Sequence, residues 1–178
     1  VLKPLHEKAK INRLIVSTYQ AVSGAGLAAI NELRENTIAT LEDKPFENKC
    51  FKKPISFNVI PQIDVFCENG YTKEEMKMIN ETKKIFNDDS IKVTATTVRV
   101  PVFNSHAESI NIEFENDFEI NDLIDTLKCA PGIVVKDDIC RRGGKSTIVA
   151  PLVDILLTIL TYLIALHTWP CATCIVIC

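Results

Sequence analysis

The chain has 178 residues, of which 47% are hydrophobic and 24% are charged, and its 20 basic and 23 acidic side chains give a formal net charge of −3. A chain of this length and apolar content can bury a core without disulfide staples, so the composition predicts one globular domain and excludes intrinsic disorder. The mild acidity argues against nucleic acid as a partner, because phosphate neutralisation requires a basic face.

Hydrophobic periodicity and turn residues predict the secondary structure of the first 138 residues. In chain order, the predicted strands are 13–19, 56–60, 92–102, 110–114 and 132–135. The predicted helices are 27–38, a helix that runs from the capping box Thr72-Lys73-Glu74-Glu75 to about residue 86, and 121–128. Two adjacent strands followed by a helix and a strand predict an α+β fold, with a mixed, largely antiparallel sheet and helices on one face.

Some of these elements carry residues suited to chemistry. The Ser23-Gly24-Ala25-Gly26 turn lies at a strand-to-helix junction, where an anion can approach bare backbone amides, although the glycines also suit a simple tight turn. Arg99 lies in an otherwise uncharged strand and His106 follows seven residues later, so the two can converge on one anionic substrate. The alternatives are a surface ion pair and a loop histidine with satisfied hydrogen bonds. Glu74 and Lys77 share a helix face at a spacing typical of an exposed ion pair.

The cysteines and the first residues bear on location and metals. Cys50, Cys67 and Cys129 are isolated, which is typical of a reduced, cytoplasmic protein. The C-x-x-C at 171–174 has no second pair and no histidine at zinc-finger spacing, so we predict no metal. Residues 3–10 carry mixed charge and no apolar stretch, so we expect no signal peptide.

Five segments together resemble aspartate-semialdehyde dehydrogenase: S-T-Y-Q-A-V-S-G-A-G (17–26), F-N-V-I-P-Q-I-D (57–64), N-G-Y-T-K-E-E-M-K (69–77), E-T-K-K-I (81–85) and V-R-V-P-V-x-x-x-H-x-E-S (98–109). The resemblance covers residues 1 to about 138. It implies the fold of the C-terminal domain of aspartate-semialdehyde and glyceraldehyde-3-phosphate dehydrogenases. It also implies NADPH-dependent reduction of L-aspartyl-4-phosphate to aspartate semialdehyde, with release of phosphate, on the route to lysine, diaminopimelate, threonine, methionine and isoleucine. The implied protein is a cytoplasmic homodimer that pairs through this domain, uses NADP, and binds neither nucleic acid nor membrane.

The resemblance also implies a role for each matching residue. Gln20 helps hold the substrate during catalysis, Arg99 binds its carboxylate, and His106 is the general acid/base beside a thiolate. Glu74 and Lys77 bind substrate, with Lys77 helping to hold the phosphate. The expected contacts with the nicotinamide end of NADP are Ser23, Gly24, Ala25 and Gly26.

The chain departs from the family pattern in what it lacks. The family's nucleophile is a cysteine in an N-C-[ST] motif, and Cys50, Cys67 and Cys129 do not lie in one. The dinucleotide domain and the family's closing segments are also missing. We therefore expect residues 1–138 to be a partial substrate-binding and dimerisation domain that is inactive by itself. The alternative is a non-catalytic dimerisation or interaction relic of that domain.

Residues 139–178 form an apolar tail outside the family pattern. One hypothesis is a translational frameshift near residue 139. The other is a membrane-anchoring helix over 148–169, preceded by basic residues. Asp154 argues against the membrane hypothesis, because a carboxylate within the bilayer is costly.

Overall fold

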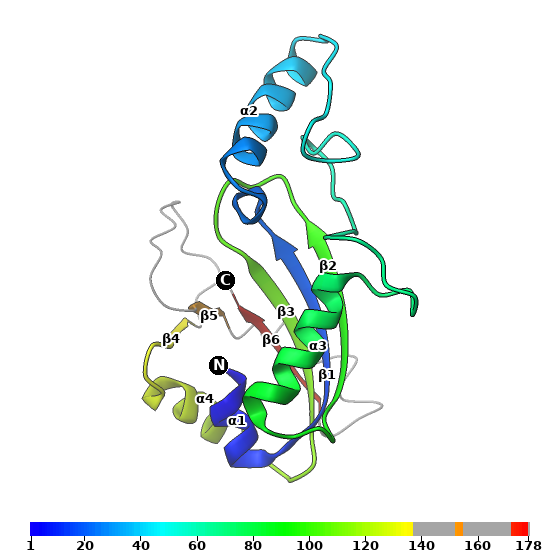
Figure 1. Ribbon diagram of the computed structural model, residues 1–178. Coiled ribbons are helices and arrows are strands. Elements are labelled where there is room, and N and C mark those ends of the chain that lie inside the picture. The colour runs from blue at the N-terminus through cyan, green and yellow to red at the C-terminus, as the bar shows by residue number, and fades with distance from the viewer. Residues whose placement is uncertain (137–151, 155–171, 178) are drawn as a thin grey trace.

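The computed structural model describes residues 1–136, 152–154 and 172–177, and the strands within them form one mixed sheet (Figure 1). The strands are β1 (Ile11–Gln20), β2 (Lys92–Arg99), β3 (Ala107–Phe114), β4 (Val134–Lys136), β5 (Leu152–Asp154) and β6 (Ala172–Ile177), in the order β2-β1-β3-β6-β5-β4. The β1–β2 and β4–β5 pairs are parallel, and the β1–β3, β3–β6 and β5–β6 pairs are antiparallel. The predicted α+β class with a mixed sheet is confirmed.

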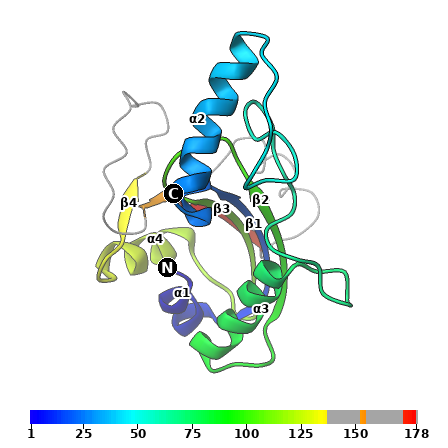
Figure 2. The same ribbon diagram turned by 45° about the horizontal axis from the view of Figure 1, so that its top comes forward.

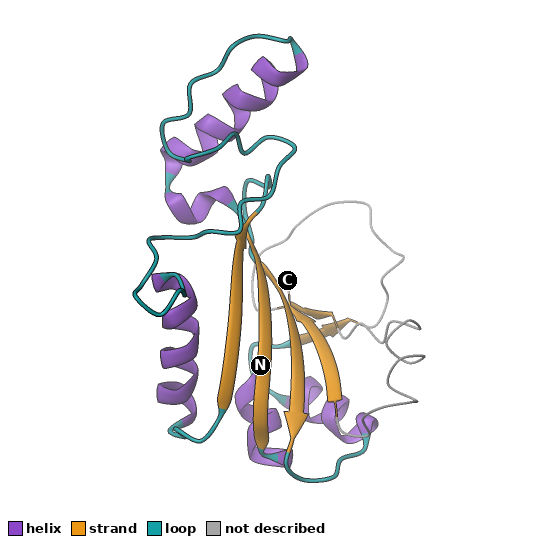
Figure 3. Cartoon of the chain, turned by 90° about the vertical axis from the view of Figure 1, so that its right-hand side faces the viewer, coloured by secondary structure: helices purple, strands orange, loops and turns teal. Residues whose placement is uncertain are grey.

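The helices occupy two places relative to this sheet. They are α1 (Leu2–Ala9), the short 3-10 helix η1 (Val22–Ala25), α2 (Leu27–Leu41), α3 (Lys73–Phe86) and α4 (Ile120–Cys129). Helices α1, α3 and α4 pack on one face, as predicted, and Figure 2 shows α1 and α3 on the concave side of the β1–β3 strands. Helix α2 does not cover the sheet but extends past the strand ends, together with the loop that follows it (Figure 3).

The main core lies between this face and the three helices. Strand alternation selects its members, because every second side chain of β1 and β3 points toward the helices. The largest fully buried apolar side chains in this cluster are Leu5, Ile11, Leu14, Ile91, Ile110, Ile112 and Leu127. Each contributes roughly 1.5–3 kcal/mol by leaving water. This core fixes the positions of the strand ends that carry the candidate site.

The opposite face of the central strands is open within the described residues. Ile15 and Tyr19 of β1 point to it, with exposed fractions of 38% and 45%. Strand β1 has a neighbouring strand on each side. These side chains are therefore exposed because nothing described covers this face of the sheet, and not because β1 is an edge strand. We call this surface, marked by Ile15 and Tyr19, the open face. Exposed apolar side chains on a central strand are typical of a surface that a partner covers.

The strand predicted at 56–60 is wrong. Only Ile60 pairs, through an isolated bridge in which its N–H and C=O bond those of Arg99, each at 2.9 Å. Pro54 and Pro61 bracket the segment, and Phe57 has a left-handed φ of 55°. A proline lacks the N–H that a ladder needs, and a left-handed residue interrupts an extended strand.

Other predicted elements are present with shifted ends. Strand β2 stops at Arg99 and not at 102, since Pro101 follows, and β3 begins at Ala107, three residues before the predicted start. Helix α1 was not predicted, because its mixed charge hides a helical spacing in which Leu5 and Ala9 are buried. The capping box is confirmed: Thr72 Oγ1 accepts from Glu75 N at 3.2 Å, and Glu75 Oε2 accepts from Thr72 N at 2.8 Å.

The predictions for the tail fall largely outside the described residues. Of the segment 148–169 the structure describes only β5, and the proposed frameshift point near 139 and Cys171 are not described. Within the described part of the chain, no helix has both the length and the apolar character to cross a bilayer.

Candidate functional site

The sheet topology brings three predicted site residues together at one end of the strands β1, β2 and β3. Gln20 and Arg99 end the parallel strands β1 and β2 and are paired in register, and His106 directly precedes β3, whose first residue pairs with Tyr19. Gln20 and Arg99 are 8% and 7% exposed, because they continue the alternation that faces the helices. Arg99 and His106 therefore converge, as predicted, because the ends of three adjacent strands lie side by side.

The Arg99 guanidinium is held by the backbone of the strand end. Its Nη1 donates to the Ala21 carbonyl oxygen at 2.6 Å. Burial lowers the pKa of Arg99, and the negative charge of Glu74 acts in the opposite direction. An arginine stays charged at physiological pH despite such a shift, so the site keeps a fixed positive charge.

His106 is oriented by the same residue. The Ala21 N–H donates to His106 Nδ1 at 3.2 Å. Ser105, just before it, has a left-handed φ of 71°, which turns the chain at this point. The N–H and C=O of Ala21 thus bond the side chains of both His106 and Arg99.

Gly24 packs directly against both side chains. A methyl group placed on Gly24 would lie 3.0 Å from Arg99 Nη1 and 3.2 Å from His106 Nε2. Contacts this short require the neighbours to move, and Arg99 Nη1 is already fixed by Ala21. Glycine therefore allows these two side chains to pack at this position without being displaced.

Helix α3 contributes the acidic part of the site. Gln20 Nε2 donates to Glu74 Oε1 at 3.1 Å, and Lys77 Nζ lies 3.9 Å from Glu74 Oε2. The Lys77 side chain is 56% exposed, so it extends toward solvent at the rim. Gln20 Oε1 is buried and has no hydrogen-bond partner among the described residues. A buried acceptor of this kind is suited to a donor group on a ligand.

A second carboxylate fixes α3 to the edge strand. Glu75 Oε1 accepts from Thr97 N of β2 at 3.1 Å while Oε2 completes the capping box. Two residues further along β2, Arg99 N donates to Ile60 O. The outward amides of Thr97 and Arg99 are thus both satisfied, which holds the end of β2 in place.

Ser23, Gly24 and Ala25 lie in η1, and Gly26 is the N-cap of α2. Ser23 N donates to Phe103 O, Gly24 N to Ala21 O, and Gly26 N to Ser23 O. The amides expected to bind an anion are therefore largely used within the chain, which argues against a phosphate-binding turn. Gly24, Ala25 and Gly26 are exposed, and Gly24 lies next to His106.

Cys50, Cys67 and Cys129, the cysteines whose surroundings the structure describes, do not lie at the candidate site. Cys50 and Cys129 are exposed and Cys67 is half-buried, in segments outside the strand ends. Burial and the neighbouring Glu32 carboxylate raise the pKa of the Cys50 thiol, which disfavours the thiolate that a nucleophile requires. No cluster of metal-ligating side chains occurs in the part of the chain that the structure describes.

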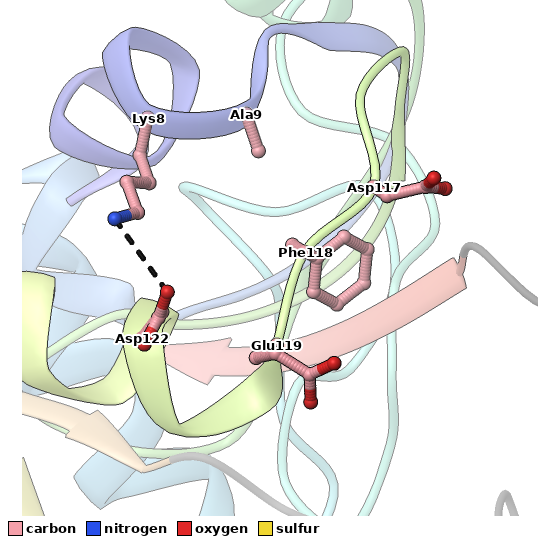
Figure 4. Close-up of a pocket in the computed structure, with 6 residues that line it drawn as sticks. All are labelled: Lys8, Ala9, Asp117, Phe118, Glu119 and Asp122. Atoms are coloured by element: carbon pink, nitrogen blue, oxygen red, sulfur yellow. Dashed lines mark ion pairs between the residues drawn. The ribbon is translucent and has the colours of Figure 1, made fainter.

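A small pocket lies elsewhere, where α1 meets the start of α4 (Figure 4). It is lined by Lys8, Ala9, Asp117, Phe118, Glu119 and Asp122, and Lys8 Nζ lies 3.6 Å from Asp122 Oδ2. Because β1 begins just after α1, this pocket is about 30 Å from the strand ends that carry Gln20 and Arg99. It is separate from the candidate site.

Sequence reasoning missed two residues of the site, Ala21 and Glu75. Ala21 acts through backbone groups, so its side chain gives no sequence signal. Glu75 was recognised as a cap, but its contact with Thr97 depends on how α3 packs against β2. Only the position of Ala21 directly after Gln20 could have drawn attention to it.

Comparisons with known proteins identify the family and the fold of this chain. The sequence model of the family described as "Semialdehyde dehydrogenase, dimerisation domain" matches residues 2–145. The aspartate-semialdehyde dehydrogenase of Aquifex aeolicus (strain VF5) is 51% identical over 138 residues, which are 77% of this chain and 41% of that protein. The solved structure of aspartate semialdehyde dehydrogenase II from Vibrio cholerae, complexed with ASA, is similar with a TM-score of 0.85 and 40% identity, over 99% of this chain and 51% of that one.

A more distant structure shares the fold. The Candida albicans aspartate semialdehyde dehydrogenase solved with NADP has a TM-score of 0.60 and 20% identity, over 99% of this chain and 47% of that one. The chain spans about 40% of the length of the curated relatives it matches.

Proposed function

Because this chain belongs to the semialdehyde dehydrogenase family through its dimerisation domain, we propose that it supplies the substrate-binding half of an aspartate-semialdehyde dehydrogenase. The reaction is the NADPH-dependent conversion of L-aspartyl-4-phosphate to L-aspartate 4-semialdehyde and phosphate, in the biosynthesis of lysine, threonine, methionine and isoleucine. The proposal depends on one observation: Gln20, Arg99 and His106 lie together where β1 and β2 end and β3 begins.

The charges of the site match the two ends of this substrate. Arg99 has a planar guanidinium that can bind the α-carboxylate with two parallel hydrogen bonds. Glu74 supplies the opposite charge for the α-ammonium group, and the unpartnered Gln20 Oε1 lies beside it as a further acceptor. Lys77, at the exposed rim, attracts the phosphate. His106 serves the reacting carbonyl as the acid/base group.

The nucleophile must come from outside the described cysteines. Cys50, Cys67 and Cys129 do not lie in the N-C-[ST] motif, and the environment of Cys50 disfavours its thiolate. The chain by itself is therefore expected to bind substrate without turning it over.

NADP fits the site at residues 23–26 through its nicotinamide end. Gly24, Ala25 and Gly26 are exposed small residues, Gly24 lies beside His106, and a methyl group on Gly26 would meet nothing within 4 Å, which supports a ring contact at this turn. Most of the amides there are already bonded, so this turn suits a ring contact better than a phosphate contact. When bound, NADPH supplies the hydride for the reduction. Gly24 keeps Arg99 and His106 close together without a side chain that would block the ring.

A homodimer through the open face completes the proposal. The family description names this domain for dimerisation, and Ile15 and Tyr19 leave an apolar surface uncovered on the central strand. The same surface favours the second candidate function, a dimerisation module without catalysis, because pairing needs no chemistry. A cytoplasmic location follows from the proposed biosynthetic role.

Binding of aspartate semialdehyde to the purified chain tests the proposal. We expect saturable binding, weakened about tenfold or more by Arg99→Lys, which keeps the charge and removes the planar fork. Arg13→Lys is the matched control, because Arg13 lies at the opposite end of β1. A chain that dimerises and fails to bind favours the dimerisation module, and equal effects of the two substitutions contradict the assigned role of Arg99.

A further inference from the structure

The inference concerns three buried polar side chains on the helix-facing side of β1 and β2. Thr18 and Thr97 are paired in register, and Gln20 follows Thr18 by two residues, so all three point to the same face. Their exposed fractions are 1%, 0% and 8% for Thr18, Thr97 and Gln20. The oxygens Thr18 Oγ1, Thr97 Oγ1 and Gln20 Oε1 have no hydrogen-bond partner among the described residues. Three neighbouring buried oxygens thus call for a partner that the described chain does not supply.

We propose that Thr18, Thr97 and Gln20 bind one buried water molecule beneath the candidate site, and that this water fixes the side-chain amide of Gln20. The two threonines are then positioning residues, because they act on substrate only through Gln20. The use of Gln20 toward substrate rests on the proposed function. The water site rests on the burial, the register and the unsatisfied oxygens of the three residues.

The three groups have the chemistry of a water site. A buried water typically makes about three hydrogen bonds to polar groups that are otherwise unsatisfied. The Gln20 oxygen can only accept, whereas each threonine hydroxyl can donate or accept. A water that donates to Gln20 Oε1 and to one hydroxyl, and accepts from the other, gives all three atoms a partner. None of the three side chains is charged, so they favour a neutral ligand over an ion.

The strand spacing suits a bridge better than a direct contact. Side chains paired on neighbouring strands start about 4.8 Å apart, as Thr18 and Thr97 do here. A direct bond between two hydroxyls needs about 2.8 Å between their oxygens. Two oxygens bonded to one tetrahedral water at that distance lie about 4.6 Å apart. One water can therefore bond both hydroxyls without a shift of the backbone.

The neighbouring pairs place this water at the boundary of the candidate site. On the side away from the strand ends, the next paired residues on the same face are Val16 and Ala95, which are apolar and each 3% exposed. On the other side are Gln20 and Arg99, which end the two strands. The water site therefore lies where the apolar core meets the polar site.

The water determines which way the Gln20 amide points. Gln20 Nε2 donates to Glu74 Oε1 at 3.1 Å. A water that donates to Gln20 Oε1 holds the other end of the same amide, so its oxygen and nitrogen cannot exchange places. An amide oxygen accepts two hydrogen bonds, which leaves one acceptor position for a donor group of the substrate.

The first experiment counts internal waters in the purified chain, without ligand. Oxygen-17 relaxation dispersion of the solvent detects waters with long residence and does not respond to exchange of hydroxyl protons. We expect the double variant Thr18→Val, Thr97→Val to hold about one internal water fewer than the wild type, because valine has the shape of threonine without the hydroxyl. Thr96→Val is the matched control, since Thr96 is exposed on the opposite face of β2. An equal count in the wild type and the double variant overturns the proposal.

Urea unfolding of the single variants gives a second test, which also serves if the double variant does not fold. If a water satisfies the hydroxyl, Thr97→Val removes a hydrogen bond and lowers the folding equilibrium constant about fivefold relative to Thr96→Val. If the hydroxyl is unsatisfied, valine removes a buried unpaired group and raises that constant. A Thr97→Val chain more stable than Thr96→Val contradicts the water site.

The effect on Gln20 is measured by its side-chain amide signals and by ligand binding. In Thr97→Val we expect these ¹H–¹⁵N signals to shift and to exchange faster with solvent, and the affinity for aspartate semialdehyde to fall about fivefold. Thr97→Ser keeps the hydroxyl and is expected to restore both. Unchanged Gln20 signals in Thr97→Val overturn the positioning role.

These measurements separate the inference from the proposed function. The water count and the Gln20 signals use no ligand, so they decide the water site by themselves. If the wild-type chain binds no aspartate semialdehyde while both measurements respond to the valine substitutions, the proposed function fails and the water site stands.

Discussion

At the scale of single residues, Gly24 is the most tightly constrained position of the site. A methyl group added there would lie 3.0 Å from Arg99 Nη1 and 3.2 Å from His106 Nε2, so these side chains would have to shift to admit it. We predict that Gly24→Ala displaces one of these side chains and weakens aspartate semialdehyde binding about tenfold or more, with little change in the unfolding temperature because Gly24 is exposed. Calorimetric titration together with thermal unfolding measures both effects.

Gly70→Ala is the control for this substitution. Gly70 has a φ of 83° and nothing within 4 Å of an added methyl group, so alanine there strains the backbone without touching the site. We expect the opposite pattern, with lower stability and unchanged binding. If Gly24→Ala binds as the wild type does, the close packing of Arg99 and His106 has no role in recognition.

At the scale of elements, Glu75 connects the first turn of α3 to β2. In Glu75→Gln, the one remaining side-chain oxygen can still accept from Thr72 N and complete the capping box. The NH₂ group then faces the Thr97 N–H, and two donors cannot bond, so the hydrogen bond between helix and strand is lost. We predict that exchange protection of the Thr97 amide falls about tenfold, as expected for loss of one hydrogen bond, while the Thr72 amide stays protected. Hydrogen exchange followed by NMR measures both amides. Unchanged protection of Thr97 would show that Glu75 does not hold the strand.

Another carboxylate anchors the loop that follows α2. Glu32 is buried and accepts hydrogen bonds from the amides of Lys49, Cys50 and Phe51. Burial by itself raises the pKa of Glu32, but these backbone bonds outweigh it and place the pKa below the usual value.

This arrangement predicts a pH dependence of stability. Because the pKa is lower in the folded state, the stabilisation is fully present above the unfolded value of about 4.3 and is lost as pH falls through the folded value. We expect the wild type to unfold at higher urea concentration than Glu32→Gln at pH 7, and this difference to shrink below about pH 4. Glu47→Gln, on the exposed surface of the same loop, is the control. A difference that stays constant with pH contradicts the role of Glu32.

The elements also show why some predictions from sequence succeed. The capping box at Thr72 and the apolar run in β1 are local signals, so the helix and strand they predict are present. The segment 56–60 has strand-forming residues, yet a strand requires a partner, and only Ile60 finds one. Helix α1 was missed for a related reason, because Leu5 and Ala9 become a core face only once the sheet is present.

In the candidate site, too, features with a local sequence signal were predicted and features that depend on tertiary packing were not. Gln20, Arg99 and His106 were identified from residue type and family resemblance, and the register of three strands brings them together. The backbone of Ala21 and the second contact of Glu75 depend on tertiary packing. No pattern of side chains along the chain encodes them.

At the scale of the whole molecule, the open face is the surface through which we propose that two copies pair. If the proposed homodimer uses this face, Tyr19→Glu places a charge on it and is predicted to convert dimers to monomers in sedimentation velocity experiments. Leu41→Glu is the control, because Leu41 is 71% exposed at the end of α2 and away from the sheet. Dimers that persist in Tyr19→Glu and dissociate in Leu41→Glu would assign the interface to α2.

The parallel pairing of β1 with β2 also has a consequence for folding. Gln20 can pair with Arg99 only when the loop formed by residues 21–91 closes. Closing such a long loop costs chain entropy before any contact forms. Helices α2 and α3 both lie within this loop, so they can form early from local contacts, whereas the edge that joins Gln20 to Arg99 forms late. A folding intermediate trapped before this closure would have native helices and no capacity to bind substrate. Recovery of binding during refolding therefore follows the slowest phase, later than recovery of helical circular dichroism.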